Sequence, residues 1–190
     1  MRKVALRDQL VTVRSRRSLL ESTEAARAIA THVLAADEVR RAASVAAYVG
    51  IGHEPLTGPL LDGLVAAGKR VILPVMLPDG DLDWAAYDGP DALVPAVRGL
   101  LEPASPRLGV DAIATPDVVL TPGLAVDRKG MRLGRGGGSY DRALSRVPVG
   151  TFVCTLLFEG ELLDTVPSDP HDQRVSAVAT PSGLTRLGAG

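Results

Sequence analysis

The sequence predicts a three-layer α/β/α domain built on a mainly parallel, mixed sheet. Apolar segments rich in Val, Leu and Ala alternate along the chain with segments of helical periodicity. The apolar segments, such as 118–127, are too continuous for a sheet with one wet face, so helices are expected to cover both faces. At 190 residues the chain has the length of one domain with a substantial core, and we expect residues 1–190 to form a single domain.

The chain is expected to begin with two helices and a strand. Residues 2–36 are rich in Ala, Leu, Arg and Glu and predict two consecutive helices, the second capped by Ser22 or Thr23. The apolar run 43–52 then ends in glycine, as a buried strand of a covered sheet does.

A helix and a strand complete the first strand–helix–strand unit. Thr57 is expected to be the N-cap of a helix over 58–67, and Gly68 its stop. The run 70–76, RVILPVM, is expected to be the next buried strand.

Residues 77–117 are rich in Pro, Gly and Asp, and within them only 82–87 indicates a strand. Regular secondary structure is expected again after this segment. The remaining expected elements are a strand, a short helix and two further strands, in that order: 118–127, 138–146, 151–158 and 175–181.

Composition narrows the class of protein. The 21 Lys and Arg residues balance 22 Asp and Glu residues to a net charge of −1, which excludes a general attraction to nucleic acid or to an anionic membrane. Cys154 is the single cysteine and is expected to be a buried thiol in a reducing compartment. The first residues lack the apolar core of a signal peptide, so we expect a cytoplasmic protein. We also expect small-molecule partners and a monomer or weak dimer.

Residues 130–144, GMRLGRGGGSYDRAL, indicate an anion site. Glycines let the backbone approach a bulky anion, and arginines offer planar charged groups that match phosphate oxygens. The alternative interpretation is an exposed turn with arginines for solubility. Ser139 stands where the third glycine of G-x-G-x-x-G would fall, so the fold is expected to be Rossmann-like without the dinucleotide fingerprint.

Two acidic residues and one basic helix face are further candidates. Asp141 follows the glycines and could hold Mg²⁺ beside a phosphate, or could be an ordinary first-turn carboxylate. Asp172 is a second metal candidate, with ordinary surface decoration as its alternative. Lys3, Arg7 and Arg14 fall on one helical face, which is either solvated or closes over an anionic ligand.

Residues 118–142, VVLTPGLAVDRKGMRLGRGGGSYDR, resemble the signature of the 5-formyltetrahydrofolate cyclo-ligase family, also called methenyltetrahydrofolate synthetases. The resemblance extends to KVALRDQLVTVR near the start, GHEPLT, GLLEPAS, and VPSDPHDQRVSAVATP near the end. It implies an ATP- and Mg²⁺-dependent conversion of 5-formyltetrahydrofolate to 5,10-methenyltetrahydrofolate, with release of ADP and phosphate. In that reaction the formyl oxygen attacks the γ-phosphate, and N10 then closes the ring and expels phosphate.

The resemblance also implies site residues, carried over by position. Arg135 would be catalytic, stabilising the transferring phosphoryl group, and Asp141 and Asp172 would hold the metal. The implied ATP-binding residues are Lys3, Arg7, Arg132, Leu133, Gly134, Arg135, Gly136, Gly137, Gly138, Ser139 and Tyr140. The implied substrate-binding residues are Glu54, Leu56, Arg135, Gly136, Gly137, Gly138 and Tyr140.

Four positions depart from the family pattern. Ser139 replaces one of two adjacent tyrosines, Leu56 stands where many relatives have a second acid, Val126 replaces a phenylalanine, and Ser176 replaces an aspartate. Two alternatives therefore stay open: a non-catalytic folate or nucleotide binder, and a related ATP-dependent ligase that acts on another formyl substrate.

Overall fold

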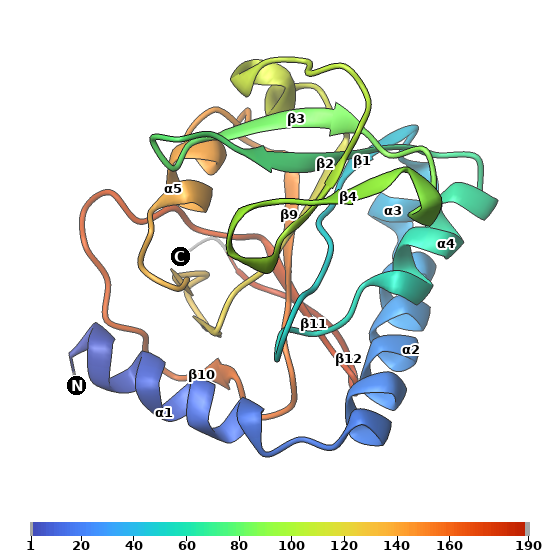
Figure 1. Ribbon diagram of the computed structural model, residues 1–190. Helices are drawn as coiled ribbons and strands as arrows, with labels where there is room; N and C mark the ends of the chain where they lie inside the picture. Colours follow the sequence, from blue (N-terminus) through green and yellow to red (C-terminus); the bar gives the residue numbers. More distant parts are fainter. Residues whose placement is uncertain (1, 189–190) are drawn as a thin grey trace.

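The protein is built around one seven-stranded sheet, shown in a computed structural model that describes residues 2–188 (Figure 1). The strands lie in the order β12-β11-β9-β6-β1-β2-β3. The five inner strands are mutually parallel, and the edge strands β3 and β12 are antiparallel to their neighbours. In chain order the strands are β1 (Ser44–Ala46), β2 (Arg70–Met76), β3 (Leu82–Ala86), β6 (Val118–Thr121), β9 (Phe152–Leu156), β11 (Ala177–Thr180) and β12 (Gly183–Arg186). The expected mainly parallel, mixed sheet is confirmed.

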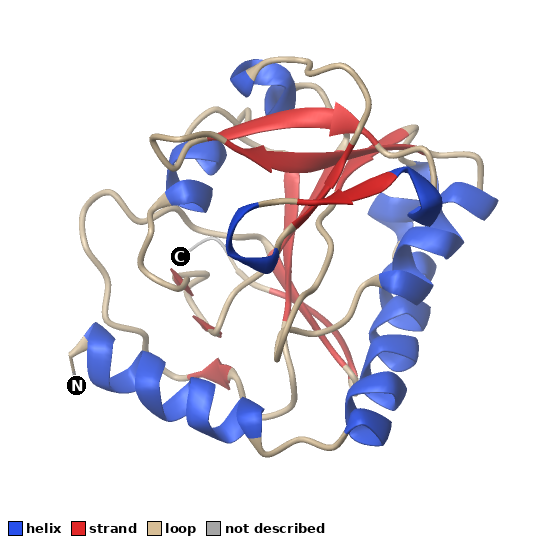
Figure 2. Cartoon of the chain, in the orientation of Figure 1, coloured by secondary structure: helices blue, strands red, loops and turns tan. Residues whose placement is uncertain are grey.

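Helices cover both faces of this sheet (Figure 2). The longest, α2, packs with α4 on one face, while α5 and the 3₁₀ helix η3 lie on the other face beside β3. The helices are α1 (Lys3–Ser15), α2 (Leu19–Ala35), α3 (Asp37–Arg41), α4 (Gly58–Ala66), α5 (Ser139–Leu144), η1 (Pro90–Ala92), η2 (Val97–Gly99) and η3 (Val110–Ala114). Within residues 2–188, each helix is too short or too polar to span a bilayer.

The sheet residues divide between two cores by simple alternation. In β6, Val118 and Leu120 belong to the core under α2 and α4, whereas Val119 belongs to the core under α5. In β9, Cys154 faces the first core and Val153 the second. Because successive side chains of a strand point to opposite faces, a strand covered on both sides must be apolar throughout. Cys154 is fully buried, as expected, and burial raises the pKa of its thiol to about 12.

The expected single strand over 118–127 is wrong. The chain leaves the main sheet after Thr121, turns at Pro122 and Gly123, and enters a second sheet as β7 (Ala125–Asp127). In this small sheet β7 lies between β10 (Leu162–Leu163) and β8 (Arg132–Leu133). The glycine-rich segment therefore follows β8 rather than a long strand of the main sheet.

The expected cap of the second helix is also wrong. Ser18 caps α2, and its side chain accepts a hydrogen bond from Glu21 N while the Glu21 carboxylate accepts one from Ser18 N. This reciprocal pair satisfies two free backbone N–H groups at the helix start, so it prevails over caps four or five residues later. Ser22 and Thr23 lie inside α2.

The strand order creates a crevice at the carboxyl ends of β1 and β6. From β1 the chain continues to β2 on one side, whereas from β6 it continues through the small sheet and α5 to β9 on the other side. Such a reversal of strand order leaves an open space beyond the strand ends, where ligands bind in this class of sheet. Helix α1 lies apart from the main sheet, next to β10 (Figure 1), and packs through Leu6 and Leu10 on Leu124, Leu133 and Val166.

Candidate active site

A cavity of about 530 Å³ occupies this crevice. Its walls come from α1, the loop after β1, the turn after β6, the glycine-rich loop, the C-terminal loop 169–172 and the hairpin of β4 (Leu93–Pro95) with β5 (Leu101–Pro103). Almost all of the expected site residues line it: Lys3, Arg7, Glu54, Arg132, Leu133, Gly134, Arg135, Gly136, Gly137, Gly138, Ser139, Tyr140, Asp141 and Asp172. The structure thus gathers segments from both ends of the chain around one space.

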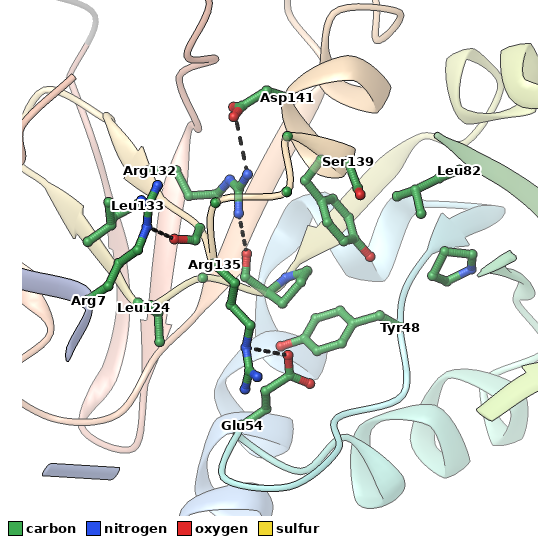
Figure 3. Close-up of a pocket in the computed structure, with 18 of the residues that line it drawn as sticks. Arg7, Tyr48, Glu54, Leu82, Leu124, Arg132, Leu133, Arg135, Ser139 and Asp141 are labelled. Atoms are coloured by element: carbon green, nitrogen blue, oxygen red, sulfur yellow. Dashed lines mark hydrogen bonds and ion pairs between the residues drawn. The ribbon is translucent and has the colours of Figure 1, made fainter. Parts of the chain in front are cut away.

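The glycine-rich loop lies close against helix α1. Arg7 Nε donates a 2.8 Å hydrogen bond to the carbonyl oxygen of Gly134 (Figure 3). Gly136 has a φ of +106°, and a Cβ atom there would come within 3.3 Å of the Arg7 guanidinium. This position needs glycine both for its backbone conformation and for the approach of Arg7.

A buried carboxylate shapes the turn that leads into the loop. Asp127 Oδ1 accepts hydrogen bonds from Lys129 N at 2.9 Å and Met131 N at 3.0 Å, and its Oδ2 accepts one from Val166 N at 3.1 Å. These bonds satisfy the carboxylate, so Asp127 acts by fixing the backbone that presents Arg132.

Arg132 lies beneath the loop rather than on it. Its side chain is buried, its Nη1 donates to the carbonyl oxygen of Pro122 at 2.9 Å, and its Nη2 lies 3.7 Å from Asp141 Oδ1. Burial lowers the pKa of Arg132, and the Asp141 carboxylate opposes that shift. Its Nε has no hydrogen-bond partner among the described residues. Arg132 therefore lines the cavity with one buried N–H donor that the described residues leave unused.

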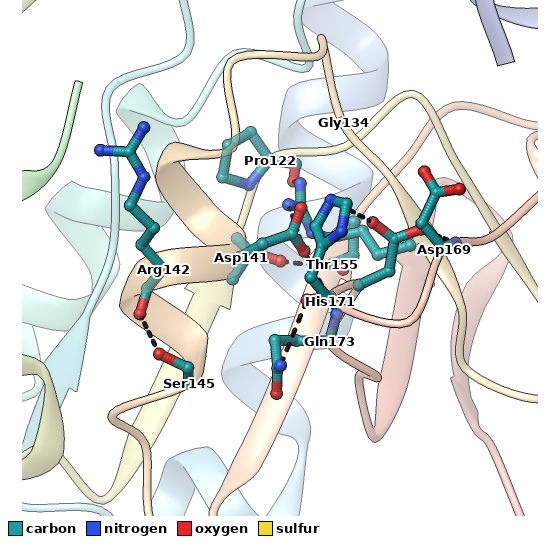
Figure 4. Close-up of polar contacts among 12 residues, drawn as sticks. Pro122, Gly134, Asp141, Arg142, Ser145, Thr155, Asp169, His171 and Gln173 are labelled. Carbon is teal, nitrogen blue, oxygen red and sulfur yellow. Dashed lines mark hydrogen bonds and ion pairs between the residues drawn. The ribbon is translucent and has the colours of Figure 1, made fainter. Parts of the chain in front are cut away.

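Asp141, His171 and Asp172 form a cluster with metal-binding spacing (Figure 4). One ligand atom from each residue can be chosen so that all three lie within 4.8 Å of one another. Asp172 Oδ2 accepts a 2.6 Å hydrogen bond from Lys3 Nζ, which also donates to Asp169. Burial works to raise the pKa of Asp172, but the bond from Lys3 and a backbone N–H outweigh it and lower that pKa. Asp172 is therefore held in the ionised form that a metal requires.

Glu54 and Arg135 meet at the opposite end of the cavity. Glu54 Oε2 accepts a 3.0 Å hydrogen bond from Ile51 N, and Glu54 Oε1 lies 3.7 Å from Arg135 Nε (Figure 3). Gly50 makes the turn possible, because a Cβ atom there would lie 2.2 Å from the carbonyl oxygen of Pro55. Leu56 is half-buried and is not among the residues that line the cavity.

Two residues of the site have positions that the sequence interpretation missed. Arg14 shares its helix face with Lys3 and Arg7, but it is 2% exposed and pairs with Glu161, so a fully solvated basic face is wrong. Tyr48 lines the cavity just beyond β1, a place that the expected strand 43–52 would have hidden within the sheet. The only indication of this position in the sequence is that an aromatic residue stands near the carboxyl end of an expected central strand.

Comparisons with known proteins agree on one family. The model of the 5-formyltetrahydrofolate cyclo-ligase family matches residues 1–181. A 5-formyltetrahydrofolate cyclo-ligase of Mycolicibacterium smegmatis is 44% identical over 150 residues, which cover 76% of this chain and 77% of that protein. A 5-formyltetrahydrofolate cyclo-ligase of Escherichia coli is 34% identical over 181 residues, which cover 90% of this chain and 97% of that protein. The NMR structure of an Aquifex aeolicus 5,10-methenyltetrahydrofolate synthetase superposes with a TM-score of 0.85 and 26% identity, covering 100% of this chain and 95% of that one.

Proposed function

The chain belongs to the 5-formyltetrahydrofolate cyclo-ligase family, and from this premise we propose how its cavity carries out the reaction. The activity is the ATP-dependent closure of 5-formyltetrahydrofolate to 5,10-methenyltetrahydrofolate. One observation carries the assignment of the site: the arginine- and glycine-rich loop, the carboxylate cluster and Glu54 border a single cavity. A reaction that joins a triphosphate to a formyl group needs both substrates in one such space.

The triphosphate of ATP is proposed to lie between helix α1 and the glycine-rich loop. Lys3 and Arg7 would approach it from the helix, while Arg132 and the loop residues would approach it from the other side. The residues assigned to ATP are Lys3, Arg7, Arg132, Leu133, Gly134, Arg135, Gly136, Gly137, Gly138, Ser139 and Tyr140. In support, Leu133 is buried against α1, where its backbone alone can serve a ligand, and Ser139 is half-buried at the cavity.

Asp141 and Asp172 are proposed to hold Mg²⁺. Their carboxylates fit this ion, which prefers oxygen ligands and usually takes one or two carboxylates together with phosphate oxygens. Bound there, Mg²⁺ would neutralise charge on the nucleotide phosphates. Lys3 already places an ammonium group against Asp172, so positive charge suits this position.

The folate is proposed to occupy the end of the cavity at Glu54, within reach of Arg135, Gly136, Gly137, Gly138 and Tyr140, with Leu56 behind the wall, two residues from Glu54. Arg135 is the proposed catalytic residue, because its ion pair with Glu54 holds it between the folate end and the phosphate loop. From there its guanidinium can stay close to the phosphoryl group while the formyl oxygen attacks the phosphorus atom. A phosphoryl transfer requires mainly that the protein positions the reactants and stabilises the charge on the transferring group. Ring closure by N10 then expels phosphate without a protein nucleophile.

We further propose that residues 1–190 form one domain, acting in the cytoplasm as a monomer or weak dimer. The match of the family model over 1–181 supports the first point, and the net charge of −1 supports small-molecule partners over nucleic acid or membranes.

The test follows the near-ultraviolet absorbance of the methenyl product on mixing protein, Mg-ATP and 5-formyltetrahydrofolate. The expected result is a rise that requires both ATP and Mg²⁺ and stops when a chelator is added. Asp164, an exposed carboxylate outside the cavity, supplies the matched control: Asp164→Asn should keep the rate, whereas Asp172→Asn should lower it. No ATP-dependent rise at high protein concentration would refute the proposal.

A further inference from the structure

Tyr48 lines the cavity and its hydroxyl group is buried. Tyr48 is 3% exposed, and its ring belongs to the core under α2 and α4 while the residue lines the cavity. Its oxygen has no hydrogen-bond partner among the described residues. Buried hydroxyls in folded proteins are normally paired, so an orphan at a binding cavity points to a partner on the ligand.

The surroundings keep this hydroxyl a donor. Burial raises the pKa of Tyr48 well above its usual value, and the Glu54 carboxylate raises it further. The Tyr140 hydroxyl is likewise buried without a hydrogen-bond partner among residues 2–188. The Tyr48 phenol therefore stays protonated near the Glu54 carboxylate and can donate its O–H group. Figure 3 shows the Tyr48 ring lying next to Glu54 and Arg135.

The backbone around Tyr48 is tied down. Its carbonyl oxygen accepts a 2.7 Å hydrogen bond from Thr57 Oγ1, which in turn accepts one from Gly50 N at 3.0 Å. Thr57 is the N-cap residue of α4, as expected, but its side chain makes no capping hydrogen bond because its hydroxyl donates to Tyr48. The ring is packed in the core and the main chain is fixed, so the hydroxyl cannot turn away to find water elsewhere.

We propose that Tyr48 determines specificity in the folate site by donating a hydrogen bond to a carbonyl oxygen of the substrate's bicyclic ring. This inference rests on the proposed function, and it adds a residue outside the glycine-rich loop. The folate is the expected acceptor because Tyr48 lies beside Glu54. The groups proposed for the triphosphate and its metal, Lys3, Arg7 and Asp172, come from other walls of the cavity. The ring carbonyl is favoured over the formyl oxygen, because a donor on the attacking oxygen would reduce its nucleophilicity.

The test compares Tyr48→Phe with Tyr87→Phe. Tyr87 belongs to the same core cluster, is 9% exposed and does not line the cavity, so its variant controls for loss of a phenol from this core. For Tyr48→Phe we expect the calorimetric Kd and the KM for 5-formyltetrahydrofolate to rise about tenfold, with kcat and the KM for ATP within about twofold. Its melting temperature should equal or exceed that of the wild type, because the change removes an unpaired buried polar group.

Three results would overturn this role. Folate affinity equal to that of Tyr87→Phe, in an enzyme that turns over, would refute it. A lowered melting temperature with unchanged folate affinity would assign the hydroxyl to the structure alone. A change in kcat without a change in KM would move the contact to the reacting atoms. Absence of turnover in the wild type would instead refute the proposed function, so the two failures are distinguishable.

Discussion

Replacing Glu161 by Gln should leave the buried guanidinium of Arg14 without its ion-pair partner and weaken the packing of helix α1 on the protein. Arg14 Nε and Nη2 donate to the two Glu161 oxygens at 2.9 and 2.8 Å, and Nη2 also donates to the Gly123 carbonyl oxygen at 2.6 Å. Both side chains are almost fully buried, at 2% and 4% exposure. Removing one partner of such a pair destabilises a protein by about 3–5 kcal/mol, because the other charge is left in a medium that solvates it poorly.

Glutamine keeps one acceptor oxygen, so we expect the lower end of that range, about 3 kcal/mol. For a chain of this size that loss corresponds to a fall in melting temperature of about 6–12 °C. Urea unfolding of Glu161→Gln and of Asp164→Asn measures the difference. Asp164 pairs with Arg128 at the surface, with side-chain exposures of 91% and 68%, and its loss should change stability by less than about 1 kcal/mol. Equal, small losses in the two variants would refute the reasoning that this pair anchors α1.

Three further predictions concern the site and the acid stability. Asp141→Asn should raise the Mg²⁺ concentration for half-maximal activity by about tenfold or more, since one of the two carboxylates proposed as Mg²⁺ ligands is lost; an unchanged metal titration would remove that assignment. Arg135→Ala should lower kcat by about 100-fold while the folate Kd rises only a few-fold, because its charge acts mainly as the phosphoryl group moves; equal losses in steady-state and binding measurements would contradict this. Hydrogen bonds from Arg146 lower the pKa of Asp81 to about 2, so the stability that its carboxylate contributes is present above about pH 4 and is lost as pH falls toward 2. Asp81→Asn should therefore show a shallower decline than the wild type when unfolding is measured across that range, and parallel curves would contradict the assignment.

Periodicity predicted the layers and most strands because both faces of the main sheet are covered. Apolar runs such as 70–76 could be recognised without knowledge of their neighbours. The break within 118–127 could not, because an apolar run looks the same whether it stays in one sheet or passes into another, and only the bend after Thr121 distinguishes them. Besides the expected strand at 82–87, residues 77–117 hold two strands, β4 and β5, that pair with each other; each has only three residues, too few to show an alternating pattern in the sequence.

The sequence predicted those parts of the site whose residues are neighbours along the chain. The glycines and arginines from Arg132 to Gly138 are adjacent in the sequence and line the cavity as expected, whereas Gly130 and Arg142 do not, and Arg142 Nη1 donates to the Asp79 carbonyl oxygen instead. The burial of Arg14 could not be predicted because its partner Glu161 lies 147 positions away in the sequence. Tyr48 was missed because only the three-dimensional structure shows that its hydroxyl group is buried without a hydrogen-bond partner among the described residues. Leu56 was assigned by alignment with an acidic position, although the structure keeps it off the cavity wall.

The long-range contacts of helix α1 determine when this helix can dock during synthesis of the chain. Its three basic side chains bind groups 127 to 169 positions further along: Gly134 for Arg7, Glu161 for Arg14 and Asp172 for Lys3. During synthesis this helix leaves the ribosome long before those partners exist, and its ordering must wait for nearly the whole chain. An incompletely synthesised protein would therefore carry its first helix undocked, and the cavity between this helix and the glycine-rich loop would form only as the final segments arrive.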